Sequence, residues 1–143
     1  MVLAVRAETL LARGDRSGAR GALEQALTIA PSAAGLLVNL AQLEEADGLY
    51  TAAVARYRRV VELQPANVIA INNLAYALAV HLDAPAEALP LARRAASLAP
   101  RSANVLDTWA WVEHLSGNHT VAAKILTDAI MLGPELAEVR FHA

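Results

Sequence analysis

Apolar residues along this chain recur at spacings of three and four, a pattern that predicts α-helices. Each helical stretch gives way to a short polar turn and a second helical stretch, and then the arrangement begins again. Gly14, Gly48 and Gly117 stand in three of these turns. Glycine adopts a positive φ without a steric penalty, so it suits a tight turn between helices. The pattern therefore predicts a chain of antiparallel helix pairs.

The helix pairs form a repeat that is closed by prolines at spacings of 34, 35 and 34 residues. These prolines are Pro31, Pro65, Pro100 and Pro134. When the four segments are superposed on them, alanine fills one column in each predicted helix. The columns are Ala7, Ala41, Ala75 and Ala110 in the first helices, and Ala19, Ala53, Ala88 and Ala122 in the second. The period predicts repeats at about 1–33, 34–67, 68–102 and 103–136, with 137–143 beginning a further helix.

These features together resemble the tetratricopeptide repeat (TPR), in its period, its small residues at close-packing columns, its turn glycine and its closing proline. The resemblance covers nearly the whole chain, although Arg6 and Trp109 stand where the repeat has leucine. It implies an all-α fold, a right-handed α-solenoid of antiparallel helix pairs, as a single domain over 1–143. In such a solenoid the first helices line a concave groove and the second helices form the convex back.

Local signals refine the predicted helices. Each closing proline should end a second helix, and Ser32, Asn67 and Ser102 follow where a side-chain oxygen can cap the next one. The third repeat has the stretch HLDAPAEAL where the others have the turn glycine, which absorbs its one extra residue. Pro90 falls inside the second helix of this repeat, where it predicts a local kink or a later helix start.

Polar residues in the first helices mark the candidate binding surface. Asn72 and Asn73 interrupt an otherwise aliphatic helix whose packed side is predicted to hold Ile71, Leu74, Ala75 and Leu78. A row of side-chain amides along the groove offers donors and acceptors that match a peptide backbone, and the resemblance implies the same use. The alternative is that these asparagines bond to neighbouring turns or to water. The predicted groove residues are Asn39, Gln42, Asn72, Asn73, Tyr76, Asn104, Asp107, Thr108 and Trp111.

The two tryptophans and the arginines of the second helices are assigned by their columns. Trp109 is expected in the core, whereas Trp111 is expected to face the groove as an aromatic anchor or to pack on a neighbouring first helix. The arginines are expected on a solvated convex face; they are Arg56, Arg58, Arg59, Arg93 and Arg94.

Composition excludes several kinds of function. The net charge of −2 gives no electrostatic footprint for nucleic acid, and the chain has no cysteine. No apolar run is long enough to cross a membrane, so no membrane insertion is expected. Catalytic residues, metal and cofactor are all expected to be absent. His114 and His119 are five residues apart, which is a poor spacing for two metal ligands on one helix.

The sequence thus predicts a non-enzymatic scaffold that binds a protein or peptide in its groove. The groove columns hold Glu8, Glu45 and Asp107 but no lysine or arginine, so a neutral or basic segment is expected rather than an acidic tail. A structural spacer, or a self-assembling array within a larger bacterial protein, is the alternative. Leu136, Val139 and Phe141 are candidates to stay exposed, to dock back on the last repeat or to join copies into a homo-oligomer. The further helix that begins at this end of the chain suggests a piece of a longer array. The compartment, cytoplasmic or periplasmic, stays open.

Overall fold

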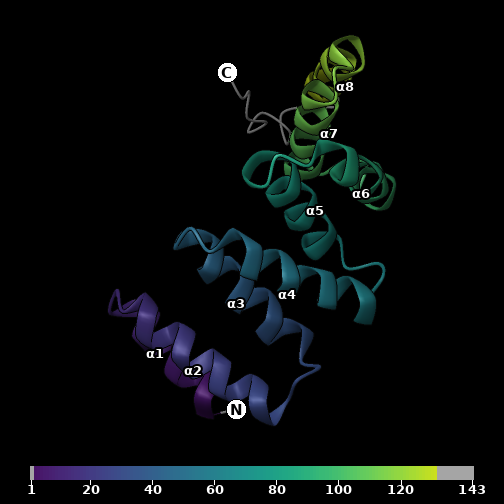
Figure 1. Cartoon of the computed structure of the whole chain (residues 1–143). Coiled ribbons are helices and arrows are strands. Elements are labelled where there is room, and N and C mark those ends of the chain that lie inside the picture. Colours follow the sequence, from purple (N-terminus) through teal and green to yellow (C-terminus); the bar gives the residue numbers. More distant parts are fainter. Residues whose placement is uncertain (1, 132–143) are drawn as a thin grey trace. The chain divides into compact units, whose positions relative to one another are not determined.

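The computed structural model describes residues 2–131, and this range folds into helices with no strand. The chain divides into two compact units, Met1–Pro65 and Ala66–Ala143 (Figure 1). Each unit contains two helix pairs joined by tight turns. The residues expected to form an exposed terminal helix, 137–143, lie outside the described range.

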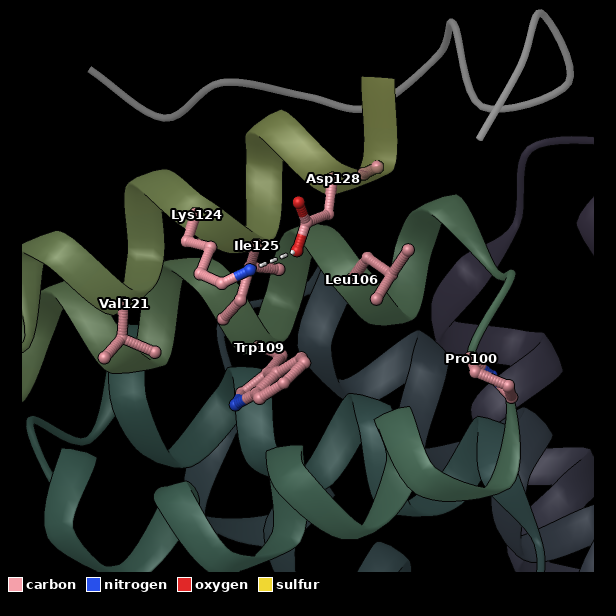
Figure 2. Close-up of a pocket in the computed structure, with 8 residues that line it drawn as sticks. Pro100, Leu106, Trp109, Val121, Lys124, Ile125 and Asp128 are labelled. Carbon is pink, nitrogen blue, oxygen red and sulfur yellow. Dashed lines mark hydrogen bonds and ion pairs between the residues drawn. The ribbon is translucent and has the colours of Figure 1, made fainter. Parts of the chain in front are cut away.

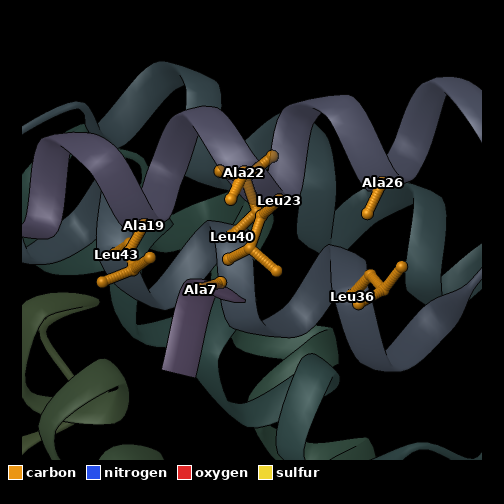
Figure 3. Close-up of a cluster of buried hydrophobic side chains, with 8 residues drawn as sticks. All are labelled: Ala7, Ala19, Ala22, Leu23, Ala26, Leu36, Leu40 and Leu43. Carbon is orange, nitrogen blue, oxygen red and sulfur yellow. The ribbon is translucent and has the colours of Figure 1, made fainter. Parts of the chain in front are cut away.

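The first unit is built from four helices, of which α1 packs on α2, α3 packs on α4, and α2 packs on α3. The helices are α1 (Val2–Ala12), α2 (Arg16–Ile29), α3 (Ala34–Ala46) and α4 (Tyr50–Leu63). Figure 3 shows the apolar cluster that joins α1, α2 and α3, with Leu23 and Leu40 at its centre. The buried members are Ala7, Ala19, Ala22, Leu23, Ala26, Leu36, Leu40 and Leu43.

Alanine makes this close packing possible. The repeat columns predicted from the sequence contain Ala19, Ala41 and Ala53, each with 0% of its surface exposed. A methyl side chain keeps high helix propensity and lets the neighbouring backbone approach closely. The columns therefore mark the seams between helices, as the repeat pattern predicts.

The second unit repeats this arrangement, with α5 on α6, α7 on α8, and α6 on α7. Its elements are α5 (Val68–Tyr76), the π-helical turn η1 (Ala77–His81), α6 (Pro85–Leu98), α7 (Ala103–Leu115) and α8 (His119–Met131). The predicted packed side of the first helix of this repeat, which runs through α5 and η1, is confirmed, because all four of its residues are buried. They are Ile71, Leu74, Ala75 and Leu78.

The extra residue of the third repeat is accommodated inside the helix. The glycines of the other turns, Gly14, Gly48 and Gly117, have φ values of 77°, 77° and 87°. Asp83 holds the equivalent place, seventeen residues before Pro100, and also has a positive φ, of 51°. The added residue therefore lies before this turn, where η1 widens the end of the first helix. A π turn is the usual way for an α-helix to hold one surplus residue.

The helix ends agree with most of the predicted signals. The second helices α2, α4 and α6 end two residues before a closing proline, as expected. Asn67 and Ser102 cap α5 and α7 by accepting hydrogen bonds from backbone N–H groups. The predicted cap at Ser32 is wrong, because α3 begins one residue later than this cap would require. Ala33 occupies the cap position and has no side-chain oxygen to offer.

Pro90 lies inside α6 without delaying its start. The helix begins at Pro85, which needs no N–H at that position, and continues to Leu98, so the predicted later start is wrong. Pro90 is exposed, as is Ala86, whose carbonyl lacks its usual partner four residues on. Solvent can satisfy that carbonyl, so the helix continues past the proline.

Candidate functional site

A cavity in the first unit brings together two of the predicted groove residues. Asn39 and Gln42 of α3 line a hollow of about 300 Å³ together with Glu8 of α1. All three side chains are exposed. The rest of the wall is apolar and consists of Ala4, Ala7, Leu11, Leu23 and Leu43. Because α1 and α3 are the first helices of consecutive pairs, this hollow lies between the elements that the resemblance assigns to the groove.

The lining of this hollow defines what it can bind. Alanine and leucine side chains form its apolar floor, two neutral amides supply donors and acceptors, and Glu8 supplies a single carboxylate. Lysine and arginine are absent from the lining residues. The hollow can therefore take an apolar or cationic group, with polar contacts to a main chain running beside it.

In the second unit, the predicted residues of α5 are half-buried. The Oδ1 atom of Asn72 is enclosed and accepts no hydrogen bond from the described part of the chain. An unsatisfied buried oxygen is unfavourable by about 1–3 kcal/mol. The Tyr76 ring meets His81 edge to face at a centroid distance of 5.8 Å. The widened turn η1 thus brings His81 back beside Tyr76 on the same helix.

The predicted residues of α7 differ in how much surface they offer. Asn104 is exposed, but Asp107 and Thr108 are only 8% and 4% exposed and present little surface to a ligand. The hydroxyl of Thr108 donates to the carbonyl of Asn104 at 3.0 Å. This bond back to the preceding turn is common for threonine inside a helix.

Trp111 is half-buried, and its ring stacks on His114 at a centroid distance of 5.0 Å and an interplanar angle of 20°. His114 in turn meets His119, with 2.8 Å between the two Nδ1 atoms. A spacing of five residues along one helix does not predict this contact. The histidines belong to two helices, since α7 ends at Leu115 and α8 begins at His119. The Gly117-Asn118 turn between them was the available signal.

A buried carboxylate anchors the same end of α7. Glu113 is 1% exposed and accepts hydrogen bonds from Arg93, Trp109 and Asn118 at 3.2, 3.0 and 2.9 Å. Burial would raise the pKa of this carboxyl, but the hydrogen bonds and the charge of the guanidinium lower it below the ordinary value of 4.5. A carboxylate held ionised in this way serves as a structural clamp.

Two arginines of the second helices pair with buried carboxylates and are not only part of a solvated surface. Arg93 of α6 pairs with Glu113, and Arg56 of α4 reaches the buried Glu44 of α3 at 3.3 Å. Both guanidinium groups remain partly exposed, at 54% and 38%. The expected convex face therefore also ties neighbouring helices together through buried carboxylates.

A second hollow of about 250 Å³ lies between α7 and α8 (Figure 2). Trp109, expected in the core, borders this hollow and remains partly exposed while it packs on the apolar cluster of α7 and α8. An ion pair between Lys124 and Asp128, 3.1 Å long, crosses its rim. The remaining lining is mostly apolar: Pro100, Leu106, Val121, Ile125 and Ala129.

Two further features of the described residues bear on other kinds of function. None of the helices within residues 2–131 is both long and apolar enough to cross a membrane. The same residues contain no group of three or more histidine, aspartate or glutamate side chains placed to hold a metal ion.

Comparison with known proteins extends these findings. The TPR repeat-containing protein PA4667 of Pseudomonas aeruginosa is 28% identical over 138 residues, which are 96% of this chain and 23% of that protein. The chain thus spans about a quarter of the length of this relative. MamA from Desulfovibrio magneticus RS-1, from residue 41 to its end, has a TM-score of 0.83 at 18% identity, covering 96% of this chain and 76% of that one.

A tetratricopeptide repeat protein from Parabacteroides merdae has a TM-score of 0.82 at 20% identity, covering 93% of this chain and 52% of that one. These structures show that the fold is shared, and the predicted fold class, an α-solenoid of antiparallel helix pairs, is confirmed. A family model described as tetratricopeptide repeat matches residues 5–67 and 38–103, which together are more than half of the chain. The chain belongs to the tetratricopeptide repeat family.

Proposed function

We propose that the chain is a protein-binding scaffold whose first helices hold an extended or helical segment of a partner. The observation that supports it most is the hollow between α1 and α3, where Asn39 and Gln42 stand beside Glu8. In the second unit, α5 and α7 offer Asn73, Tyr76 and Trp111 as half-buried surface. The proposal includes no catalytic role.

The size of the hollow favours a peptide over a cofactor. About 300 Å³ is at the lower limit of small-molecule sites. It suits one or two side chains of a partner with the adjoining main chain. Exposed amides at Asn39 and Gln42 can pair with that main chain without reading its sequence. The apolar floor would then supply the affinity, and the two amides would fix the position of the peptide main chain along the hollow.

Charge favours a neutral or basic partner segment. Glu8 places a carboxylate at the hollow, and its lining has no cation to balance an acidic ligand. An acidic peptide would add like charge beside Glu8, whereas a lysine or arginine would pair with it. Salt should weaken binding of a basic peptide, because screening reduces this attraction.

A peptide-display selection tests the proposal. The wild type is compared with the double variant Asn39→Ala/Gln42→Ala and with Gln25→Ala, a matched control that removes an exposed amide from the second helix α2. We expect neutral or basic peptides to be enriched on the wild type and the control and lost on the double variant. Circular dichroism first establishes that each variant is folded. Equal enrichment on all three chains, or a preference for acidic peptides, would contradict the proposal and favour the spacer function.

We also propose that the face formed by α7 and α8 receives the first helix pair of another copy. In the third repeat, Ile71 and Leu74 occupy the columns of Leu106 and Trp109, and they are 0% and 2% exposed. Leu106 is 7% exposed and Trp109 is half-buried, and within residues 2–131 both line an open hollow. Because α6 is covered by α7, a first helix is the element that suits such a face.

A further inference from the structure

We infer that His114 and His119 form a two-histidine binding site for a divalent copper or nickel ion. The site lies where α7 ends and α8 begins, and the inference is independent of peptide binding. Both side chains are exposed, so an ion can reach them from solvent. Their Nδ1 atoms are 2.8 Å apart.

The turn between the two helices fixes this pair in place. Asn118 donates from its backbone to the carbonyl of Glu113 at 2.8 Å, and from its side chain to the Glu113 carboxylate at 2.9 Å. Gly117 donates to the carbonyl of His114 at 3.0 Å and has a φ of 87°. The histidines therefore project from a turn that is held at both ends. A site that is already arranged loses little conformational entropy when an ion binds.

Trp111 orients the first of the two rings. Its indole lies nearly parallel to the His114 imidazole, at 20° and a centroid distance of 5.0 Å. The His119 ring meets the His114 ring at an interplanar angle of 63° and a centroid distance of 4.6 Å. Stacking keeps the Nδ1 edge of His114 toward His119, in the way that outer contacts orient metal-binding histidines.

The 2.8 Å between the two Nδ1 atoms is a hydrogen-bond distance. Neutral imidazole has one N–H and one lone pair, so one ring donates and the other accepts. When the donating ring carries its proton on Nε2 instead of Nδ1, two lone pairs remain on neighbouring Nδ1 atoms. A metal ion can then bind both atoms while each neutral ring keeps its own proton on Nε2, so no net proton is released. No oxidation or bond cleavage is involved.

The separation of the donors selects the kind of metal. With metal–nitrogen bonds of about 2.0 Å, nitrogens 2.8 Å apart subtend roughly 90° at the ion. This angle corresponds to neighbouring positions of a square-planar or tetragonal centre, which Cu(II) and Ni(II) prefer. Tetrahedral Zn(II) would require donors about 3.3 Å apart. The pair therefore favours copper and nickel over zinc.

The remaining coordination positions belong to water or to a donor from another molecule. The described residues provide no third histidine, aspartate or glutamate placed for the same ion. The two histidines therefore supply half of a square-planar coordination shell at the end of α7. The exposed position of the site leaves the other half accessible.

Fluorescence of the full chain provides the test, because Trp111 touches one of the ligands. Paramagnetic Cu(II) or Ni(II) bound beside the indole should quench its emission saturably, at one ion per chain. We expect the quench to disappear in His119→Ala and to persist in His81→Ala, which removes the histidine beside Tyr76. In Trp111→Phe the quench should be lost while calorimetry still detects one bound ion.

Competition and fold controls complete the experiment. Zn(II) should displace Ni(II) only at a large excess, if the angle at the metal decides the preference. His114→Gln and His119→Gln are second variants that keep a polar side chain of similar length, and circular dichroism checks the fold of each. Equal quenching in the wild type and both glutamine variants would overturn the inference, as would zinc binding tighter than nickel.

Discussion

Glu113 is the residue on which the last described helix pair depends most. Replacing it with alanine leaves Asn118 and the Trp109 indole without their acceptor and Arg93 without its partner. We expect a loss of about 1–3 kcal/mol in the free energy of unfolding, as for charged hydrogen bonds. Urea unfolding at neutral pH measures it. The matched control is Glu62→Ala, since Glu62 is 67% exposed in its ion pair with Arg59 and its loss should change little.

The same carboxylate predicts how stability depends on pH. Its pKa in the folded chain lies below 4.5, the ordinary value that it regains on unfolding. Between these two values the unfolded chain binds a proton that the folded chain does not, so stability rises with pH. The contribution of Glu113 to stability is therefore complete above pH 4.5 and is lost as the pH falls through the pKa that this carboxyl has in the folded chain. In Glu113→Gln the free energy of unfolding should fall less steeply with acidification than in the wild type. Equal slopes would show that another group is responsible.

At the residue scale the sequence predicted apolar positions better than polar ones. The period alone placed Ile71, Leu74 and Ala75 in the core, because helical spacing determines which side of α5 faces its partner. It did not predict that Glu44 and Glu113 would be buried, since their ion partners come from other helices. Burial of a charge depends on a partner in space, which spacing along one helix does not reveal.

At the scale of the elements, replacing glycine with alanine should have opposite effects on stability at two positions. Gly48 has a φ of 77° with open space around its Cβ position, whereas Gly21 lies inside α2, also with open space. Gly48→Ala should lower the free energy of unfolding by about 1 kcal/mol, because alanine is strained in the left-handed backbone conformation. Gly21→Ala should raise it by about 0.5–1 kcal/mol, because alanine has the higher helix propensity. Thermal unfolding of the two variants compares them directly. A loss of stability in both would show that side-chain contacts, not backbone conformation, decide the sign.

The predicted helices agreed with the structure because period, turn glycine and closing proline all indicated the same boundaries. The third repeat was the exception. The sequence showed that it held one extra residue near HLDAPAEAL, but it did not show on which side of the turn. Asp83 takes a conformation that favours glycine, so the turn keeps its place and the surplus residue moves into η1. Composition cannot reveal this, because the stretch ALAVH resembles ordinary helix.

For the whole molecule, the proposed α7–α8 face predicts self-association. A face that binds the first helix pair of another copy makes a head-to-tail contact, which continues into open-ended assemblies. The mass from light scattering should therefore rise steadily with protein concentration. Val121→Glu should suppress this rise, because Val121 borders the hollow and is 43% exposed. An acidic residue in the first turn of α8 also suits the helix dipole, so the fold should be retained.

The control for this experiment is Ile69→Glu. Ile69 is 60% exposed and lies in the first turn of α5, so the substitution is the same in chemistry and in place along a helix. It does not line the α7–α8 hollow, and its variant should associate like the wild type. A constant monomer mass for all three chains would remove the self-association proposal and leave the peptide-binding proposal untouched.

The π turn η1 has a consequence for aligning these repeats and for building chimeras from them. An insertion in a helical repeat is ordinarily placed in the loop, where added length changes little. Here the third repeat keeps its turn and carries its insertion within 77–81. One residue in a regular α-helix would rotate all that follows by roughly 100°. A chimera that joins this repeat to its neighbours with the gap in the loop would therefore misdirect His81 and Asp83, whereas one with the gap inside the helix would preserve both.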